Sequence, residues 1–173
     1  MHLVATTSAL FLDVPMTNCP PLHQLLPHEA PMILVDDLID VGEKHIHCRV
    51  AISRHCLYFD SKTQSIPAYV GIEFMAQTVA GWSGFHAWKN GEDTPIGFLL
   101  GCRRYHSECS EFKEHDILDI HAEQIMENNG MAVFDCKIIC HEQIVASSQL
   151  NAFVPSKSQL EQMQLDNNNR KNP

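Results

Sequence analysis

The sequence predicts an α+β domain in which an antiparallel sheet wraps around one long central helix. A long apolar stretch at residues 66–88 is preceded by two strand-like segments and followed by four. A helix that is apolar on nearly every side either spans a membrane or is enclosed by the rest of its own domain. A sheet curled around this helix accounts for the order of the elements and for the burial of the helix.

Length, charge and cysteine content limit the class of protein. The 173 residues suffice for one well-packed domain and are too few for two ordinary ones. A formal net charge of -9 argues against nucleic acid as a partner, because binding to its phosphate backbone needs a basic surface. The seven cysteines form no CxxC pair and show no zinc-like spacing to histidines, which indicates reduced thiols. The chain starts without the pattern of a secretory signal, so we expect a cytoplasmic protein.

Both ends of the chain are predicted to lie outside the folded domain. Residues 1–21 show no firm periodicity and end in a turn-forming cluster, so we interpret them as an N-terminal arm. The domain itself is expected to cover residues 22–155. Residues 156–173 are mostly Ser, Gln, Asn, Lys and Asp with little to bury, which predicts a disordered tail.

A hairpin is predicted before the central helix. Residues 22–26 are expected to form a short helical turn that stops at a proline. Two strands should follow at 32–41 and 45–52, with a turn at 42–44 between them.

The central helix is predicted to open at Pro67 and to end at Asn90-Gly91. Polar residues, among them Glu73 and Gln77, interrupt the apolar run and leave it short of a membrane span. Glu73 is the unusual residue, because a buried carboxylate is costly unless it is paired or protonated. It therefore needs a structural or functional explanation.

Four strands are predicted after the helix, at about residues 96–106, 117–127, 131–140 and 144–154. Several of them alternate apolar and polar side chains, as expected for strands with one buried face. Asn128-Asn129-Gly130 is a strong hairpin turn between two of them.

Three motifs in this order resemble the hotdog-fold 3-hydroxyacyl-(acyl carrier protein) dehydratases. They are LPHEAPMILVDDLIDV at 26–41, PAYVGIEFMAQ at 67–77 and FLLGCRRYHSECSEFKEHDILDI at 98–120. The resemblance covers about residues 22–154. It is closest to the dehydratase-like proteins found with aryl polyene biosynthesis, whose combination of PAYVGIEFMAQ and GFLLGCRRY is present almost unaltered.

The resemblance implies an activity and a set of partners. It implies a lyase that converts 3-hydroxyacyl-ACP to trans-2-enoyl-ACP in fatty-acid-like, aryl polyene chain elongation. The substrate would be an acyl chain linked through phosphopantetheine to acyl carrier protein. The protein would form a dimer, with itself or with another hotdog dehydratase, and its active sites would lie at the subunit interface. No metal, organic cofactor or membrane insertion is implied.

The sequence departs from the family pattern at the catalytic histidine. The housekeeping dehydratases carry it in a Gly-His-Phe-Pro motif shortly before the helix, where this chain has HCLYFDSKTQSIP. Counting back from Glu73 places Phe59 at that position. His55 on the same loop and His28 in the Leu-Pro-His motif are the two candidates to partner Glu73, and the sequence leaves the choice open.

Dehydration requires removal of an α-proton and protonation of the departing hydroxyl. A histidine suits the first task, and the resemblance gives Glu73 the second. The N–H groups at the start of the helix, around Val70 and Gly71, are candidates to bind the thioester oxygen. Gln77 lies one turn after Glu73 and is expected to orient it or to pack as a buried amide. Gly101 is a further candidate for substrate binding.

One compact basic group is expected near the mouth of the pocket, formed by Arg103, Arg104 and Lys113. An acyl carrier protein is acidic and its prosthetic group carries a phosphate, so this group is the candidate docking site. The alternative is that these are ordinary solvated strand charges. In a regular strand, one of the two neighbouring arginines should point inward.

Other interpretations stay open. Loss of the usual histidine favours a non-enzymatic hotdog subunit that pairs with an active dehydratase. An acyl thioesterase is a third interpretation, since related thioesterases use a carboxylate on this helix. His45 and His47 share a strand face, but without an evident third ligand we predict no metal site.

Overall fold

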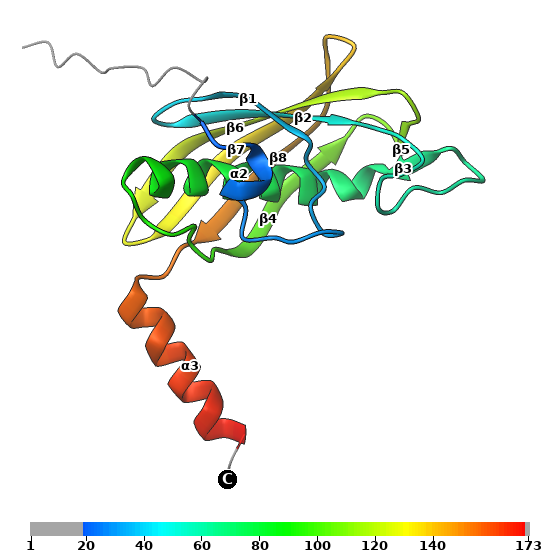
Figure 1. Cartoon of the computed structure of the whole chain (residues 1–173). Helices are drawn as coiled ribbons and strands as arrows, with labels where there is room; N and C mark the ends of the chain where they lie inside the picture. The colour runs from blue at the N-terminus through cyan, green and yellow to red at the C-terminus, as the bar shows by residue number, and fades with distance from the viewer. Residues whose placement is uncertain (1–18, 172–173) are drawn as a thin grey trace, which may run out of the picture.

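The computed structural model describes residues 19–171, so most of the arm predicted at 1–21 lies outside the described residues. The described part folds into helices, strands and one 3₁₀ turn (Figure 1). In chain order these are α1 (Leu22–Leu25), β1 (Asp37–Val41), β2 (His45–Ala51), β3 (Ser65–Pro67), η2 (Ala68–Val70), α2 (Gly71–Lys89), β4 (Phe98–Ser107), β5 (Glu111–Lys113), β6 (Ile117–Asn128), β7 (Met131–Cys140), β8 (Gln143–Phe153) and α3 (Lys157–Lys171).

Six strands form one antiparallel sheet in the order β1-β2-β6-β7-β8-β4, and β3 pairs with β5 in a small separate sheet. The large sheet curves around α2, and α1 packs against α2 (Figure 1). This arrangement confirms the predicted α+β class and its hotdog form, with the central helix enclosed by the sheet. The edges of the large sheet are β1 and β4.

The core lies between the large sheet and α2, and the alternation along the strands builds it. On β7, Phe134, Cys136 and Ile138 are buried, while Asp135 and Lys137 between them are exposed. Side chains of opposite character therefore point to opposite faces, as the period of two in the sequence predicts.

The central helix is enclosed on most sides, and even its polar Gln77 and Thr78 are fully buried. It begins at Gly71 rather than at the predicted Pro67, because Pro67 ends β3 and the 3₁₀ turn η2 comes first. The helix ends at Lys89, and the predicted Asn90 caps it, with its backbone N–H bonded to carbonyls of the last turn. None of the described helices is both long and apolar enough to cross a lipid bilayer.

The first strand is shorter than predicted, since β1 begins at Asp37 and not at residue 32. The Asp36 N–H still bonds to the Arg49 carbonyl of β2, but the residues before it are held by a helix side chain. Gln77 of α2 donates from Nε2 to the Met32 carbonyl at 2.7 Å, and its Oε1 accepts from the Leu34 N–H at 2.8 Å.

The tail that we predicted to be disordered instead contains helix α3, which projects away from the sheet (Figure 1). Ser156 and Gln159 explain its start. The Gln159 N–H donates to Ser156 Oγ at 3.3 Å, and the Ser156 N–H donates to Gln159 Oε1 at 2.8 Å. This reciprocal pair is a capping box, which satisfies backbone donors that a helix start otherwise leaves without partners.

Candidate functional site

A cavity of about 360 Å³ lies between α2, the segment after α1 and the start of β4. Its wall is mostly apolar, and the polar side chains on it are few. His28 contributes from the segment after α1, and Glu73 and Ser83 contribute from α2. The structure thus brings together two of the three predicted catalytic residues, His28 and Glu73, although 45 positions separate them in the sequence.

Gln77 holds Glu73 in place. Its Nε2 donates to Glu73 Oε1 at 2.9 Å and also to the Met32 carbonyl, while its Oε1 accepts from the Leu34 N–H. The expected bond between Gln77 and Glu73 is therefore present. Because Gln77 is fully buried and uses both ends of its amide, it ties α2 to the segment that follows His28.

His28 has a ring nitrogen without a partner. Its Nδ1 is buried, and it neither accepts nor donates a hydrogen bond within the described part of the chain. A buried polar atom left unsatisfied costs about 1–3 kcal/mol. Because His28 also lines the cavity, a polar group of a ligand bound there is the candidate partner for this nitrogen.

His55 does not lie on this cavity. It is exposed on the loop between β2 and β3, where it lines a different cavity of about 610 Å³ together with Phe59 and Phe74. Its backbone N–H donates to Ser53 Oγ at 3.4 Å. Phe59, which stands where the family histidine was expected, packs half-buried against the core. Within one chain, the structure therefore separates His55 from Glu73.

The start of α2 differs from our expectation. Val70 and Gly71 are buried and do not line the cavity that holds Glu73. The Gly71 N–H donates to the carbonyls of Ala68 and Tyr69, because the 3₁₀ turn η2 precedes the helix. The Tyr105 hydroxyl donates to the same Ala68 carbonyl. The expectation of a free Gly71 N–H for the thioester oxygen is therefore corrected.

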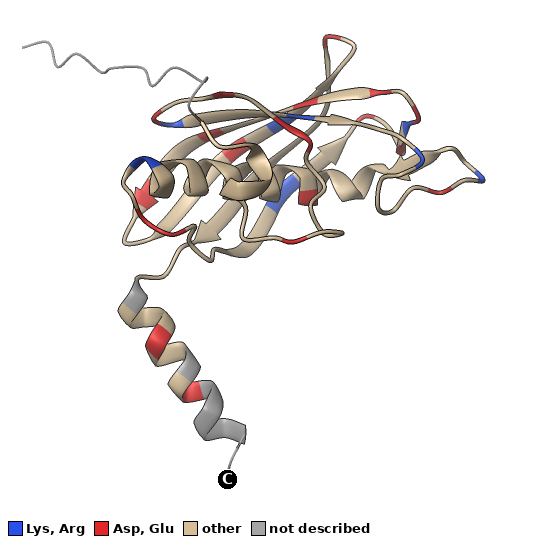
Figure 2. Cartoon of the chain, viewed as in Figure 1, with Lys and Arg blue, Asp and Glu red and all other residues tan. Residues whose placement is uncertain are grey.

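The predicted docking residues lie on two sheets. Arg103 and Arg104 are both exposed on β4, which Figure 2 shows as a blue segment of that strand. We expected one of them to point inward, but the strand pairing shifts after Arg103 and Arg104 adopts a φ of 55°. Such a bulge turns neighbouring side chains to the same side. Lys113, the third predicted docking residue, lies on β5 and pairs with Glu111.

Gly101, the further candidate for substrate binding, is half-buried on β4 and lies outside the Glu73 cavity.

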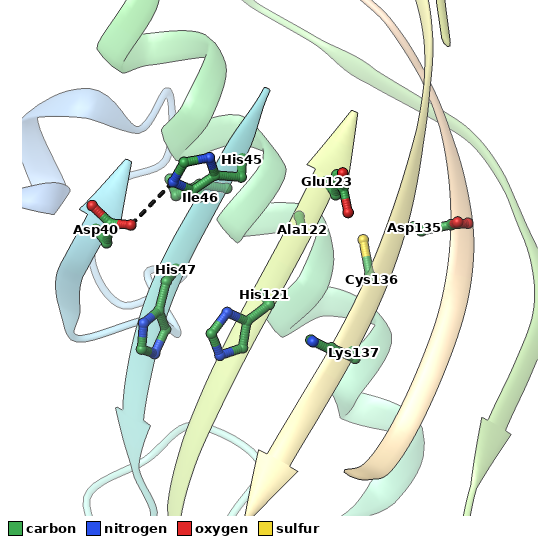
Figure 3. A pocket seen from close by; sticks show the side chains of 10 residues that line it. All are labelled: Asp40, His45, Ile46, His47, His121, Ala122, Glu123, Asp135, Cys136 and Lys137. Atoms are coloured by element: carbon green, nitrogen blue, oxygen red, sulfur yellow. Dashed lines mark hydrogen bonds and ion pairs between the residues drawn. The ribbon is translucent and has the colours of Figure 1, made fainter. Parts of the chain in front are cut away.

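A further cavity, of about 340 Å³, lies on the face of the sheet that points away from α2 (Figure 3). His47 and His121 stand directly opposite each other on β2 and β6, and their rings stack at a centroid distance of 4.0 Å. His47 also pairs with Asp119 at 2.8 Å, and His45 with Asp40 at 3.0 Å. The structure thus adds a third histidine to the predicted pair. Stacked rings, however, do not direct their nitrogen lone pairs at one point, so this group is not arranged as a metal site.

Sequence comparisons relate the chain to dehydratases. The sequence profile of the ApeP-like family, described as ApeP dehydratase, matches residues 20–164. The chain is also similar to the 3-hydroxyacyl-[acyl-carrier-protein] dehydratase FabZ of Pseudothermotoga lettingae. The two are 27% identical over 137 residues, which are 77% of this chain and 93% of that protein.

Structure comparisons agree. A chain of the dehydratase heterocomplex ApeI:P from Xenorhabdus doucetiae is 31% identical, with a TM-score of 0.77 over 83% of this chain and 97% of that one. A hypothetical thioesterase with coenzyme A from Streptococcus pneumoniae TIGR4 is 13% identical, with a TM-score of 0.55 over 69% of this chain and 85% of that one. At that identity, the second likeness concerns the fold alone.

Proposed function

Because the chain belongs to the ApeP-like dehydratase family, we propose that it dehydrates 3-hydroxyacyl chains carried on acyl carrier protein, in chain elongation of the aryl polyene type. The observation that carries this proposal is the shared cavity of His28 and Glu73. The name of the FabZ relative supports the substrate class, and the GFLLGCRRY motif supports the aryl polyene branch.

The reaction breaks one C–H and one C–O bond and releases water. His28 removes the α-proton through its unpaired Nδ1, and Glu73 protonates the departing hydroxyl. Gln77 bonds to Oε1 of Glu73, and no hydrogen bond to Oε2 is found among the described residues. We therefore assign the proton transfer to Oε2. Gln77 acts as a positioning residue because it fixes the carboxylate and the segment that follows His28.

Arg103 and Arg104 form the docking site for the carrier protein in this proposal. The bulge in β4 exposes both guanidinium groups, and neither forms an ion pair within the described residues. Two adjacent exposed arginines can bind a phosphate or acidic side chains. Lys113 contributes less, because Glu111 already neutralises it.

A second candidate function is a subunit that supports an active hotdog partner. Two observations favour it: Phe59 stands where the family histidine was expected, and the similar Xenorhabdus doucetiae chain belongs to a dehydratase heterocomplex. In this case the partner would supply the catalytic histidine.

The test is a dehydration and hydration assay with acyl-ACP substrates, run on the chain alone and with an added hotdog dehydratase. We expect Glu73→Gln and His28→Ala each to lower turnover by about 10²–10⁴-fold, the usual contribution of a general acid or base. His55→Ala is the matched control, since His55 lies on another cavity. Full turnover in the Glu73→Gln protein would refute the mechanism.

The same assay separates the other candidate functions. Activity that requires the partner and survives His28→Ala would favour the second candidate, and release of free thiol would indicate a thioesterase.

A further inference from the structure

Three potential metal ligands meet at the end of the sheet, on two turns that are distant in sequence. Asp116 directly precedes β6, Cys140 ends β7, and His141 begins the turn between β7 and β8. A carboxylate oxygen, the thiol sulfur and an imidazole nitrogen from these residues all lie within 4.8 Å of one another. No other group of this kind is found among the described residues.

The spacing fits ligands of a single ion. Zinc binds sulfur at about 2.3 Å and nitrogen or oxygen at about 2.0–2.2 Å, so tetrahedral ligand atoms lie roughly 3.3–3.7 Å apart. The distance from His141 Nε2 to Asp116 Oδ1 is 3.3 Å. This is longer than the usual 2.7–2.9 Å or so of a direct charge-assisted hydrogen bond. At this distance the two groups form a long hydrogen bond, and the same spacing also suits two ligands of one ion.

The backbone preorganises the cluster. The other carboxylate oxygen of Asp116, Oδ2, accepts the Lys113 N–H at 2.8 Å, which leaves Oδ1 to face His141. On the other turn, His141 and Glu142 have φ values of 49° and 64°, and β7 and β8 pair on either side of them. A two-residue turn with two positive φ values is tight, so it fixes the His141 backbone beside Cys140.

We propose that Asp116, Cys140 and His141 bind Zn²⁺, with water as the fourth ligand, and that the ion fastens the turn before β6 to the β7–β8 turn. Thiolate, imidazole and carboxylate together suit Zn²⁺ and not Mg²⁺ or Ca²⁺, which prefer oxygen ligands only. On binding, the Cys140 thiol gives up its proton to solvent and the Zn–S bond forms.

This site is separate from the proposed active site. Ala152 and Val154, at the end of β8, line the Glu73 cavity, whereas the cluster lies next to the start of the same strand. The proposed role is therefore structural, and it does not depend on the proposed dehydratase function. The proposal departs from the sequence-based expectation of no metal. Spacing rules search for ligands that are close in sequence, and Asp116 joins the other two only through strand pairing.

The test uses Co²⁺ as a spectroscopic probe for Zn²⁺ on the full chain under reducing conditions. The chain has 11 histidines, so metal binding alone proves little, whereas a thiolate-to-cobalt charge-transfer band reports a cysteine ligand. We expect one equivalent of Co²⁺ to produce this band and Zn²⁺ to displace it. The melting temperature should rise with added Zn²⁺, because an ion that binds only the folded chain stabilises it.

Variants decide whether these three residues are the ligands. Cys140→Ser should abolish the band. His141→Ala and Asp116→Asn should weaken Co²⁺ binding by at least about tenfold, the lower range for loss of even an outer-sphere partner. Both change residues near the surface, so they test the site even if the Cys140 variant misfolds. His106→Ala is the matched control, because His106 also pairs with a carboxylate, that of Glu108, at 2.9 Å. No band, or a band that neither near-surface variant weakens, would overturn the proposal.

Discussion

His121 sits on the outer face of the sheet in an environment that favours its neutral form (Figure 3). Burial lowers its pKa below the usual 6.5, and positive charge on His47 of β2 and Lys137 of β7 lowers it further. Asp119 on the same strand and Asp40 of β1 act in the opposite direction but do not outweigh these effects. Protonation of His121 therefore costs more in the folded chain than in the unfolded one.

This depressed pKa predicts a loss of stability in acid. Between the folded and the unfolded pKa, the unfolded chain binds more protons, so stability increases with pH in that window. The contribution is fully present above about pH 6.5 and is lost as pH falls through the folded pKa. We expect His121→Asn to show a shallower slope of unfolding free energy between about pH 5 and 7 in urea titrations. His55→Asn controls for removal of a histidine elsewhere, and an unchanged slope in the His121 variant would contradict the prediction. Burial also lowers the pKa of His86, so His86 accounts for part of the pH dependence that remains in the His121 variant.

Single residues differ in how much of their role the sequence reveals. Glu73 stands out as an acid in an apolar helix, and Gln77 lies one turn away, so their contact follows from helical spacing alone. Their position relative to His28 does not follow from spacing. It depends on the path of the loop after α1, which the hydrogen bonds from Gln77 to Met32 and Leu34 fix. For this reason the sequence left the choice between His28 and His55 open.

At the scale of elements, the contact between α1 and α2 controls the position of His28. A Cβ on Gly84 of α2 would lie only 1.8 Å from the Leu25 carbonyl oxygen of α1, so the two backbones touch there. We expect Gly84→Ala to push α1 away, to lower the free energy of unfolding by about 1–3 kcal/mol and to reduce dehydratase turnover. Chemical denaturation and the acyl-ACP assay measure the two effects. Gly101→Ala is the matched control for stability, because nothing lies within 4 Å of its added Cβ. Equal stability of the two variants would rule out this contact as a constraint.

Long elements with a clear period were predictable, and short or irregular ones were not. The strands β6, β7 and β8 begin and end within a residue of their predicted bounds because alternating burial marks each of them. The pair of β3 and β5 has three residues a strand, too few to show a period. The bulge at Arg104 lacks the glycine that usually marks a positive φ. The α3 helix was missed because its polar composition outweighed the capping pair of Ser156 and Gln159.

For the whole molecule, the two edges of the large sheet differ in character. Four large apolar side chains are exposed on β4 or just before it: Ile96, Phe98, Leu99 and Leu100. An unpaired edge with a contiguous apolar patch favours association with another chain. On the β1 edge, Ile39 is exposed among the acidic residues Asp36, Asp37 and Asp40, which discourage such contact. The sequence shows that both segments are strands, but only the pairing order shows which ones end the sheet.

This asymmetry predicts that the β4 edge is where the chain meets a second hotdog subunit. Leu100 is 53% exposed and lies outside the Glu73 cavity, so its replacement tests association without altering the wall of that cavity. We expect Leu100→Glu to cost about 2 kcal/mol of association free energy, or about 30-fold in Kd, because it places a charge in an apolar contact. Ile39→Glu, at a side chain that is 37% exposed on the opposite edge, should leave association unchanged. Sedimentation velocity on the chain alone and mixed with a hotdog dehydratase measures both variants. Weaker association in the Ile39 variant alone would place the interface on the β1 edge instead.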